Sequence, residues 1–280
     1  MGGDSGENGG NNGGDNGGDN GPNPPSDHPQ KDLYPDFDEI MSNKFGDYLW
    51  EGLEVTTEDD YILTTFHIWK AGAVNDDKGP VLFQHGSGGN AFGWLNGPRG
   101  ELPNCFKLAD MGHHIYLGNN RGAKYSKGHI SLDYKDDAVE YWRFSQTELT
   151  RDVYAQVGAM YTNAGQKKGY YFGSSLGGAQ MTLALINDES RLVDKLNRAI
   201  ILAPCTVLGA NTEPLLNDYN LEKNGALVDL GVHSLPTADW NASVIAIQND
   251  DRISDNDANR YAEKWRNTDT DTVDNWSPQR

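Results

Sequence analysis

The sequence predicts an α/β fold, with a mostly parallel, doubly wound sheet and helices on both faces. Two observations predict it. From Leu33 onward, short β-like runs alternate with helix-like runs. In addition, the run at 80–84 is continuously apolar between glycines, which is typical of a strand buried on both faces. We expect one domain, at residues 33–280.

The expected strands begin with a hairpin. Residues 52–58 and 61–69 alternate apolar and polar side chains on either side of Asp59-Asp60, which predicts a hairpin at the sheet edge. The later expected strands lie at 80–84, 114–117, 169–172, 198–202 and 244–247. The expected helices lie at 101–111, 146–163, 178–186 and 258–266.

The charge of the chain excludes nucleic acid as a partner. The 280 residues contain 23 Lys+Arg and 41 Asp+Glu, which gives a formal net charge of -18. Binding to phosphates needs clustered Lys and Arg, so this chain would repel a nucleic-acid backbone and an anionic membrane surface. No stretch approaches the ~20 consecutive apolar residues of a membrane span. We therefore expect no transmembrane segment.

Residues 1–32 differ in composition from the rest of the chain. Residues 1–30 contain ten Gly, four Pro and five acidic residues but no Lys or Arg. Such a segment cannot bury enough apolar surface to offset its chain entropy, so we expect a disordered tail. It shows no basic region followed by an apolar core, so no signal peptide is visible. Asn241 and Asn275 fit the glycosylation pattern of secreted proteins.

Residues Gly173-Ser174-Ser175-Leu176-Gly177 form the main chemical motif. They fit G-x-S-x-G between an expected strand and an expected helix, the setting in which this motif presents a serine nucleophile on a strained turn. Side chains at the two glycine positions would collide with the neighbouring strand and helix. We predict Ser175 as a nucleophile at the carboxyl edge of the sheet, where the helix N-terminus favours developing negative charge. A glycine-rich turn without chemistry is the alternative.

A glycine-rich segment, Gln84 to Gly89, follows the strand at 80–84. A backbone without bulky side chains turns its N–H groups toward the site. We predict the amides of Ser87 and Leu176 as the donors of an oxyanion hole. His85 is an alternative general base, although a histidine at a strand end beside a loop glycine more often packs structurally.

Acidic residues follow the expected strand at 244–247. In this kind of sheet the catalytic groups follow the chain order serine, acid, histidine. We predict Asp251 as the orienting acid, with Asp250 as the weaker candidate and Asp255 as a helix N-cap. An acidic loop at the start of a helix is the alternative.

Further motifs occur in collinear order between Phe37 and Lys264. They are Glu54–Asp59 with Tyr61–Leu63, Gln84–Gly86, Leu108–Asp110 leading to Leu117–Gly122, and Val139–Trp142 with Phe144-Ser145. Together with the serine motif they resemble the acid lipase family of gastric and lysosomal lipases, which are α/β-hydrolases of triacylglycerols and sterol esters.

The resemblance implies a serine hydrolase of lipid esters that works through an acyl-enzyme. It assigns Ser175 as nucleophile, Asp251 as acid, and Ser87 and Leu176 as oxyanion amides. It also implies a lysosomal or secreted location. No cofactor or metal is expected, and the two cysteines, Cys105 and Cys205, are interpreted as buried thiols.

Several features depart from the family pattern. Ser174 and Leu176 flank the nucleophile where the family has His and Gln, and Ser87 stands where it has a hydrophobic residue. The stretch 211–240 is too short and polar to form the family's cap and lid, so we expect an open site and weak interfacial activation. All seven histidines precede Asp251, and we expect the final strand and helix of the fold to be missing.

Two classes of function therefore remain. A serine without its histidine base loses most of its acceleration. The chain is either an incomplete lipase or a non-catalytic relative that binds lipid or a partner protein. The joint presence of the serine, the acid and the oxyanion loop favours the lipase. His233 is a further alternative as base, on the wrong side of the acid in chain order.

Overall fold

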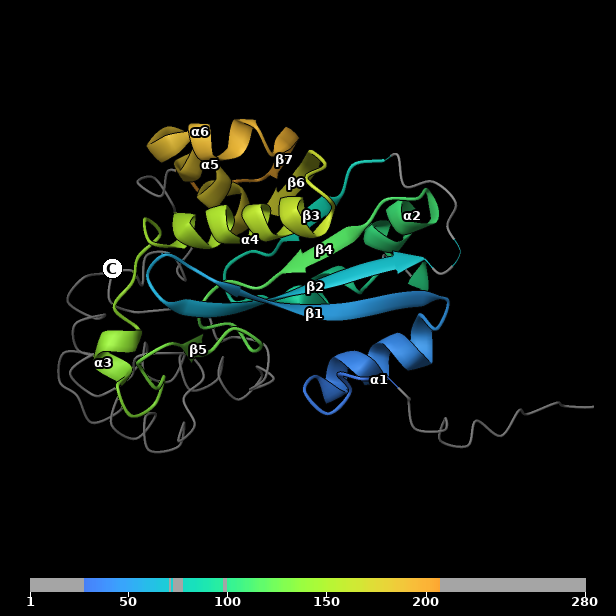
Figure 1. Ribbon diagram of the computed structural model, residues 1–280, viewed down its shortest axis with the longest axis horizontal. Coiled ribbons are helices and arrows are strands. Elements are labelled where there is room, and N and C mark those ends of the chain that lie inside the picture. The colour runs from blue at the N-terminus through green and yellow to red at the C-terminus, as the bar shows by residue number, and fades with distance from the viewer. Residues whose placement is uncertain (1–27, 71, 73–77, 98–99, 207–280) are drawn as a thin grey trace, which may run out of the picture. The chain divides into compact units, whose positions relative to one another are not determined.

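A computed structural model describes residues 28–70, 72, 78–97 and 100–206 (Figure 1). The chain divides into two compact units, Met1–Phe45 and Gly46–Arg280. In the first unit the described helix is α1 (Pro35–Lys44), which begins with a proline, a residue whose backbone suits the first helical position. The strand predicted at 244–247, the helix predicted at 258–266 and most of the predicted tail lie outside the described residues.

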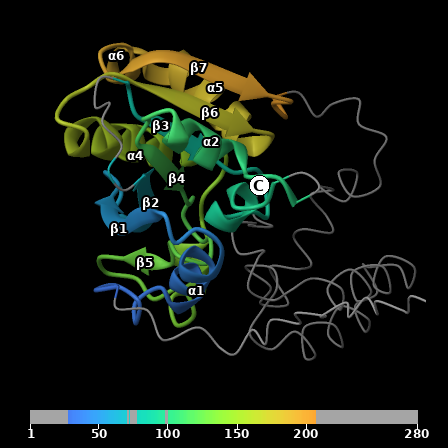
Figure 2. The ribbon, with the colours of Figure 1, turned by 90° about the vertical axis from the view of Figure 1, so that its right-hand side faces the viewer.

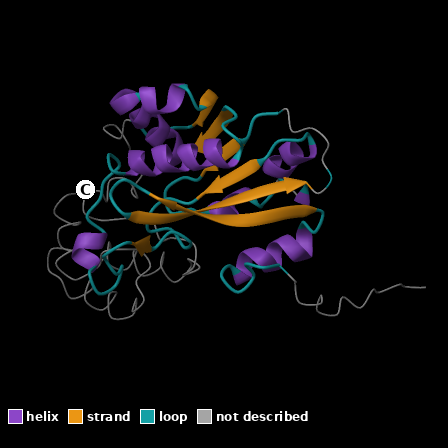
Figure 3. Cartoon of the chain, in the orientation of Figure 1, coloured by secondary structure: helices purple, strands orange, loops and turns teal. Residues whose placement is uncertain are grey.

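The second unit contains a mixed sheet, whose strands are orange in Figure 3. The strand order is β1-β2-β4-β3-β6-β7, with β5 paired to β2. The first two strands form the predicted hairpin, and the second pairs antiparallel with the fourth. The short β5 also pairs antiparallel with β2, whereas the pairs β3–β4, β3–β6 and β6–β7 are parallel. The bounds are β1 (Tyr48–Thr56), β2 (Tyr61–Lys70), β3 (Val81–Gln84), β4 (Ile115–Gly118), β5 (Gly128–His129), β6 (Gly169–Ser174) and β7 (Leu196–Leu202). The predicted α/β class is confirmed.

Helices cover both faces of this sheet, α4 and α5 on one and α2 on the other (Figure 2). The bounds are η1 (Ala91–Trp94), α2 (Asn104–Asp110), α3 (Ala138–Tyr141), α4 (Leu149–Asn163), α5 (Leu176–Asp188) and α6 (Ser190–Val193). The sequence predicted α2, α4 and α5. It did not predict α3, α6 or η1, because four residues are too few to show helical periodicity. None of the described helices combines the length and apolar character that crossing a membrane requires.

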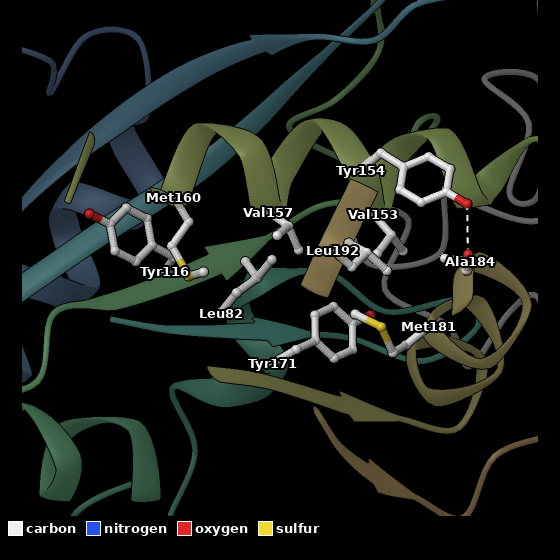
Figure 4. Packing of buried hydrophobic residues seen from close by; sticks show 10 residues of the cluster. All are labelled: Leu82, Tyr116, Val153, Tyr154, Val157, Met160, Tyr171, Met181, Ala184 and Leu192. Atoms are coloured by element: carbon white, nitrogen blue, oxygen red, sulfur yellow. Dashed lines mark hydrogen bonds between the residues drawn. The ribbon is translucent and has the colours of Figure 1, made fainter. Parts of the chain in front are cut away.

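The strands divide their side chains between the two faces, as the period of two requires. On one face, Leu82, Tyr116 and Tyr171 point toward α4 and α5 (Figure 4). Tyr154 of α4 donates its hydroxyl to the carbonyl of Ala184 in α5 at 2.7 Å, which joins the two helices above the sheet. On the opposite face, Phe83 and Phe172 lie with their ring centroids 5.1 Å apart.

A buried arginine connects three separate segments of the unit. Arg121, in the loop after β4, is 0% exposed and forms a two-pronged ion pair with Asp59 in the turn between β1 and β2, at 2.7 and 2.9 Å. Its Nε and its backbone N–H each donate to the buried carboxylate of Asp152 in α4 at 2.8 Å. The guanidinium also lies 4.0 Å from the ring centroid of Tyr61. Every polar side of this buried cation is therefore compensated.

Asp59 is the outer member of the cluster. It also accepts a hydrogen bond from Arg151 at 2.8 Å and from the hydroxyl of Thr57 at 2.7 Å. Burial by itself raises the pKa of Asp59, but the hydrogen bonds and charge of Arg121 and Arg151 outweigh it and hold the pKa well below its usual range. The carboxylate therefore stays ionised at neutral and mildly acidic pH.

We expect Arg121→Met to lower the free energy of unfolding by about 3–5 kcal/mol, because it leaves the buried carboxylate of Asp152 without its cation. Urea unfolding followed by tryptophan fluorescence measures the change. The control is Arg143→Met at an exposed position, which we expect to change stability by no more than about 0.5 kcal/mol. Equal effects of the two substitutions would contradict the role given to the ion-pair cluster.

Candidate active site

Ser175 occupies the turn between β6 and α5. Its backbone has φ 53° and ψ -117°, a conformation that residues with a side chain rarely adopt. Its N–H donates to the carbonyl of Leu202 in β7 at 2.9 Å, and its carbonyl accepts from the N–H of Ala179 at 3.0 Å. The neighbouring strand and the first turn of the helix therefore hold the strained residue in place. The predicted strand–turn–helix setting of this serine is present.

The two motif glycines are required by close approach to the backbone. A Cβ at Gly173 would lie 2.6 Å from the carbonyl carbon and oxygen of Gly177. A Cβ at Gly177 would lie 2.5 Å from the carbonyl oxygen of Gln84 and 2.7 Å from that of His85. Contacts below 3.0 Å with backbone atoms cannot be relieved by a rotamer change. The helix after Ser175 therefore packs directly on the end of β3.

The loop after β3 passes against Ser175. A Cβ at Gly86 would lie 3.0 Å from Cβ of Ser175 and 3.5 Å from its Oγ. The loop closes on itself through a hydrogen bond of 3.2 Å from the N–H of Gly89 to the carbonyl of Gly86, with Gly88 at φ 68°. This is a tight turn that needs glycine at its third position. Ser87, within this turn, is exposed.

Leu176 is the first residue of α5, so its N–H belongs to the helical turn whose amides have no partner inside the helix. Its side chain is 7% exposed and packs in a cluster of buried hydrophobic side chains. That cluster consists of Val55, Tyr61, Leu63, Tyr141, Trp142, Phe144, Leu149 and Leu176. The structure thus brings Ser175, Leu176 and the loop carrying Ser87 together. Asp250, Asp251, Asp255 and His233 lie outside the described residues.

His85 is fully engaged in structural contacts. Its Nδ1 lies 2.7 Å from the carbonyl of Gly86, and its Nε2 accepts a hydrogen bond from the N–H of Asn120 at 3.1 Å. These partners require a neutral ring protonated on Nδ1. Burial lowers the pKa of His85 to about 4. Neither nitrogen is left to take a proton from Ser175, so His85 does not supply the general base in this arrangement.

Cys205 is a residue at the site whose place the sequence did not reveal. Its Sγ lies 3.4 Å from the Oγ of Ser175, in the turn after β7 where Ala203 has φ 42°. The interpretation as a buried thiol holds for Cys105, whose pKa is raised to about 12 by burial, but is wrong for Cys205, which is half-buried. The available signal was its position just past a parallel strand, on the edge where the serine also lies.

Two histidines in contact, His67 and His114, lie near the amino-terminal end of β4, whereas Ser175 lies at the carboxyl end of β6. Nδ1 of His67 in β2 lies 2.8 Å from a carboxylate oxygen of Glu51 in β1, and its Nε2 lies 2.7 Å from Nδ1 of His114. Burial and the neighbouring His114 lower the pKa of His67 to about 4. Within the described part of the chain, no group of three or more His, Cys, Asp or Glu side chains could hold a metal ion.

Comparisons with known proteins agree with this geometry. The family model described as alpha/beta hydrolase fold matches residues 79–237, and the model described as partial alpha/beta-hydrolase lipase region matches residues 41–97. Both Ser175 and the loop after β3 lie within the first match.

Two similar curated proteins are lipases of Mus musculus. Lipase member K of Mus musculus is 32% identical over 206 residues, which cover 71% of this chain and 50% of that protein. Gastric triacylglycerol lipase of Mus musculus is 35% identical over 174 residues, which cover 60% of this chain and 42% of that protein. The chain spans about half the length of the curated relatives it matches. The resemblance to acid lipases that the sequence motifs indicated is confirmed.

We expect Gly177→Ala to destabilise the protein by about 1–3 kcal/mol, because the added methyl group meets two backbone carbonyls on the end of β3. The same substitution at Gly158, inside α4, meets no atom within 4 Å. There it should stabilise by up to about 1 kcal/mol through the better helix propensity of alanine. Thermal unfolding of the two variants measures the contrast, and destabilisation of equal size at both positions would contradict the close approach.

We also expect stability to fall as the pH is lowered from about 6.5 to about 4. His67 and His85 stay neutral in the folded protein down to a pKa of about 4, while the unfolded chain takes up their protons near the ordinary value of 6.5. Their contribution is therefore complete above pH 6.5 and lost as the pH falls through about 4. Melting temperatures across this range measure the effect. A melting temperature that rises toward pH 4 would show that the protonation of His67 and His85 does not determine the pH dependence of stability.

Proposed function

The chain belongs to the alpha/beta hydrolase fold family, and we propose that it is a serine hydrolase of carboxylic esters whose substrates are lipid esters, of the triacylglycerol or sterol ester type. The single observation that carries the proposal is the setting of Ser175. The residue is held in a strained conformation between a parallel strand and a helix N-terminus, with the loop after β3 against its side chain. Strain of this kind is kept where function needs it.

The proposed reaction proceeds through an acyl-enzyme. Oγ of Ser175 attacks the ester carbonyl carbon and its proton passes to a base, while the negative charge on the carbonyl oxygen is met by the amides of Ser87 and Leu176. The carbon–oxygen bond to the alcohol then breaks, and the alcohol leaves with a proton. Water attacks the acyl group in the same way, releases the acid and restores the serine. Asp251 is proposed to orient the base.

The general base determines how fast residues 1–280 by themselves hydrolyse an ester. His85 is committed to Gly86 and Asn120, and all seven histidines precede Asp251 in the sequence. We therefore propose a slow enzyme in this form, in which Ser175 still forms the acyl-enzyme but without the acceleration that a histidine base adds. A non-catalytic relative that binds lipid or protein is the second candidate, favoured by the same commitment of His85.

Relatedness supports the substrate class and the location. The matched relatives are lipases, and one of them is a gastric triacylglycerol lipase. We propose a lysosomal or secreted protein with a lipid ester as substrate.

We expect Ser175→Ala to abolish the hydrolysis of p-nitrophenyl butyrate by residues 1–280, because no other group is proposed to form the acyl-enzyme. Ser174→Ala, one residue earlier at the end of β6, is the matched control and should keep the activity within about threefold of the unchanged protein. Release of nitrophenol measures both. Equal rates in the protein and in Ser175→Ala would support the binding function instead, whereas rapid hydrolysis that depends on Ser175 would place a base such as His233 within these residues.

A further inference from the structure

The ring of His85 bridges the loop after β3 and the loop after β4. On one side, its protonated Nδ1 donates to the carbonyl of Gly86 at 2.7 Å. On the other side, its Nε2 accepts the N–H of Asn120 at 3.1 Å. The residue is 3% exposed, so water competes with neither contact. The carbonyl oxygen of Gly86 also accepts a hydrogen bond from the N–H of Gly89 at 3.2 Å. This oxygen therefore accepts two hydrogen bonds, one from the ring and one from the turn.

The two hydrogen bonds on the Gly86 carbonyl determine the orientation of the next amide. The carbonyl of Gly86 and the N–H of Ser87 belong to the same planar, trans peptide unit, so they point in opposite directions. Holding the oxygen toward the ring therefore keeps the Ser87 N–H turned away from it. A rotated peptide would present a carbonyl oxygen in place of that N–H, an acceptor where developing negative charge needs a donor.

We propose that His85 is a positioning residue that aims the Ser87 amide by holding the carbonyl of Gly86. The inference deepens the proposed ester hydrolysis and depends on it for the role of Ser87. It assigns the histidine no contact with substrate and no proton transfer to Ser175.

The far side of the ring gives this arrangement its rigidity. Asn120 precedes Arg121, whose own N–H and side chain are bound to the buried carboxylate of Asp152. The neighbouring Asn119 accepts the N–H of Ala91 at 2.8 Å, and so ties the same loop to the far end of the segment that contains Ser87. His85 is thus a link between a loop held by ion pairs and a turn of small residues.

Two substitutions of His85 distinguish the contact made by Nδ1 from the contact made by Nε2. In His85→Asn the amide nitrogen takes the place of Nδ1 and can still donate to Gly86, while the contact with Asn120 is lost. In His85→Gln the amide group reaches the place of Nε2, and the donor to Gly86 is lost. A structural role alone predicts similar losses for both variants, whereas the positioning role predicts that the asparagine variant retains the oxyanion hole and the glutamine variant does not.

The test uses residues 1–280 and two measurements. The first is the affinity for n-butylboronic acid followed by boron NMR, because the boron accepts Ser175 Oγ with release of a proton and the adduct carries its negative charge where the oxyanion forms. We expect affinity within about threefold of the unchanged protein for His85→Asn and about 10²-fold weaker for His85→Gln, the usual loss for one oxyanion donor. The second is the NMR shift of the Gly86 carbonyl carbon and the Ser87 amide, which should move much further in His85→Gln than in His85→Asn, because both variants lose the ring current of the imidazole but only the glutamine variant loses the hydrogen bond.

The outcomes distinguish this inference from the proposed function. If Ser175→Ala abolishes boronate binding while His85→Gln binds like the unchanged protein, the positioning role is wrong and the nucleophile stands. If both histidine variants lose affinity equally, the ring is structural and the inference is also overturned. If Ser175→Ala binds as well as the unchanged protein, the proposed nucleophile is wrong, and the resonances of Gly86 and Ser87 still decide whether His85 orients the peptide.

Discussion

The rest of the described second unit depends on one interaction, the ion pairing of the buried Arg121 guanidinium with the carboxylates of Asp59 and Asp152. Taking a cation out of water is costly unless geometry and hydrogen bonds compensate it. Here the compensation comes from a hairpin turn, a helix and the face of Tyr61 at once. Because each partner belongs to a different segment, the loop after β4 has one position relative to the sheet.

The loop after β4 in turn fixes the segment after β3 at the candidate site. Asn119 and Asn120 hold the segment after β3 through the N–H of Ala91 and the ring of His85. Ser175, the proposed nucleophile, is anchored independently, since α5 packs on the end of β3 at Gly177 and carries Leu176 into the aromatic cluster. One side of the site is thus held by buried polar groups and the other by close packing. These two sides of the site meet at Ser175, where the proposed acyl transfer needs a fixed nucleophile facing fixed donors.

Two residues with a strained backbone lie at the carboxyl ends of β6 and β7. Ser175, between β6 and α5, and Ala203, after β7, both have positive φ without being glycine. The second of these turns brings the thiol of Cys205 to the serine hydroxyl. Such conformations cost of order 1–3 kcal/mol each and persist only where the surrounding structure over-determines them. The hydrogen bond from the N–H of Ser175 to Leu202 is one such restraint, because it ties the two strained strand ends together.

Local pattern was sufficient for the features that depend on neighbouring residues. The alternation around Asp59-Asp60 predicted the hairpin, and the glycines around Ser175 predicted the strained turn, because their steric requirement is set within a few positions of the chain. Sequence by itself thus determined the α/β class, the nucleophile candidate and the family. Only the tertiary structure decided that Asp59 binds Arg121, that His85 holds a loop and leaves no nitrogen for a base, and that Cys205 lies beside Ser175. The contacts of Asp59 with Arg121, of His85 with Asn120 and of Cys205 with Ser175 join residues 30 or more positions apart. Their partners are decided by how strands and loops pack, which no local pattern records.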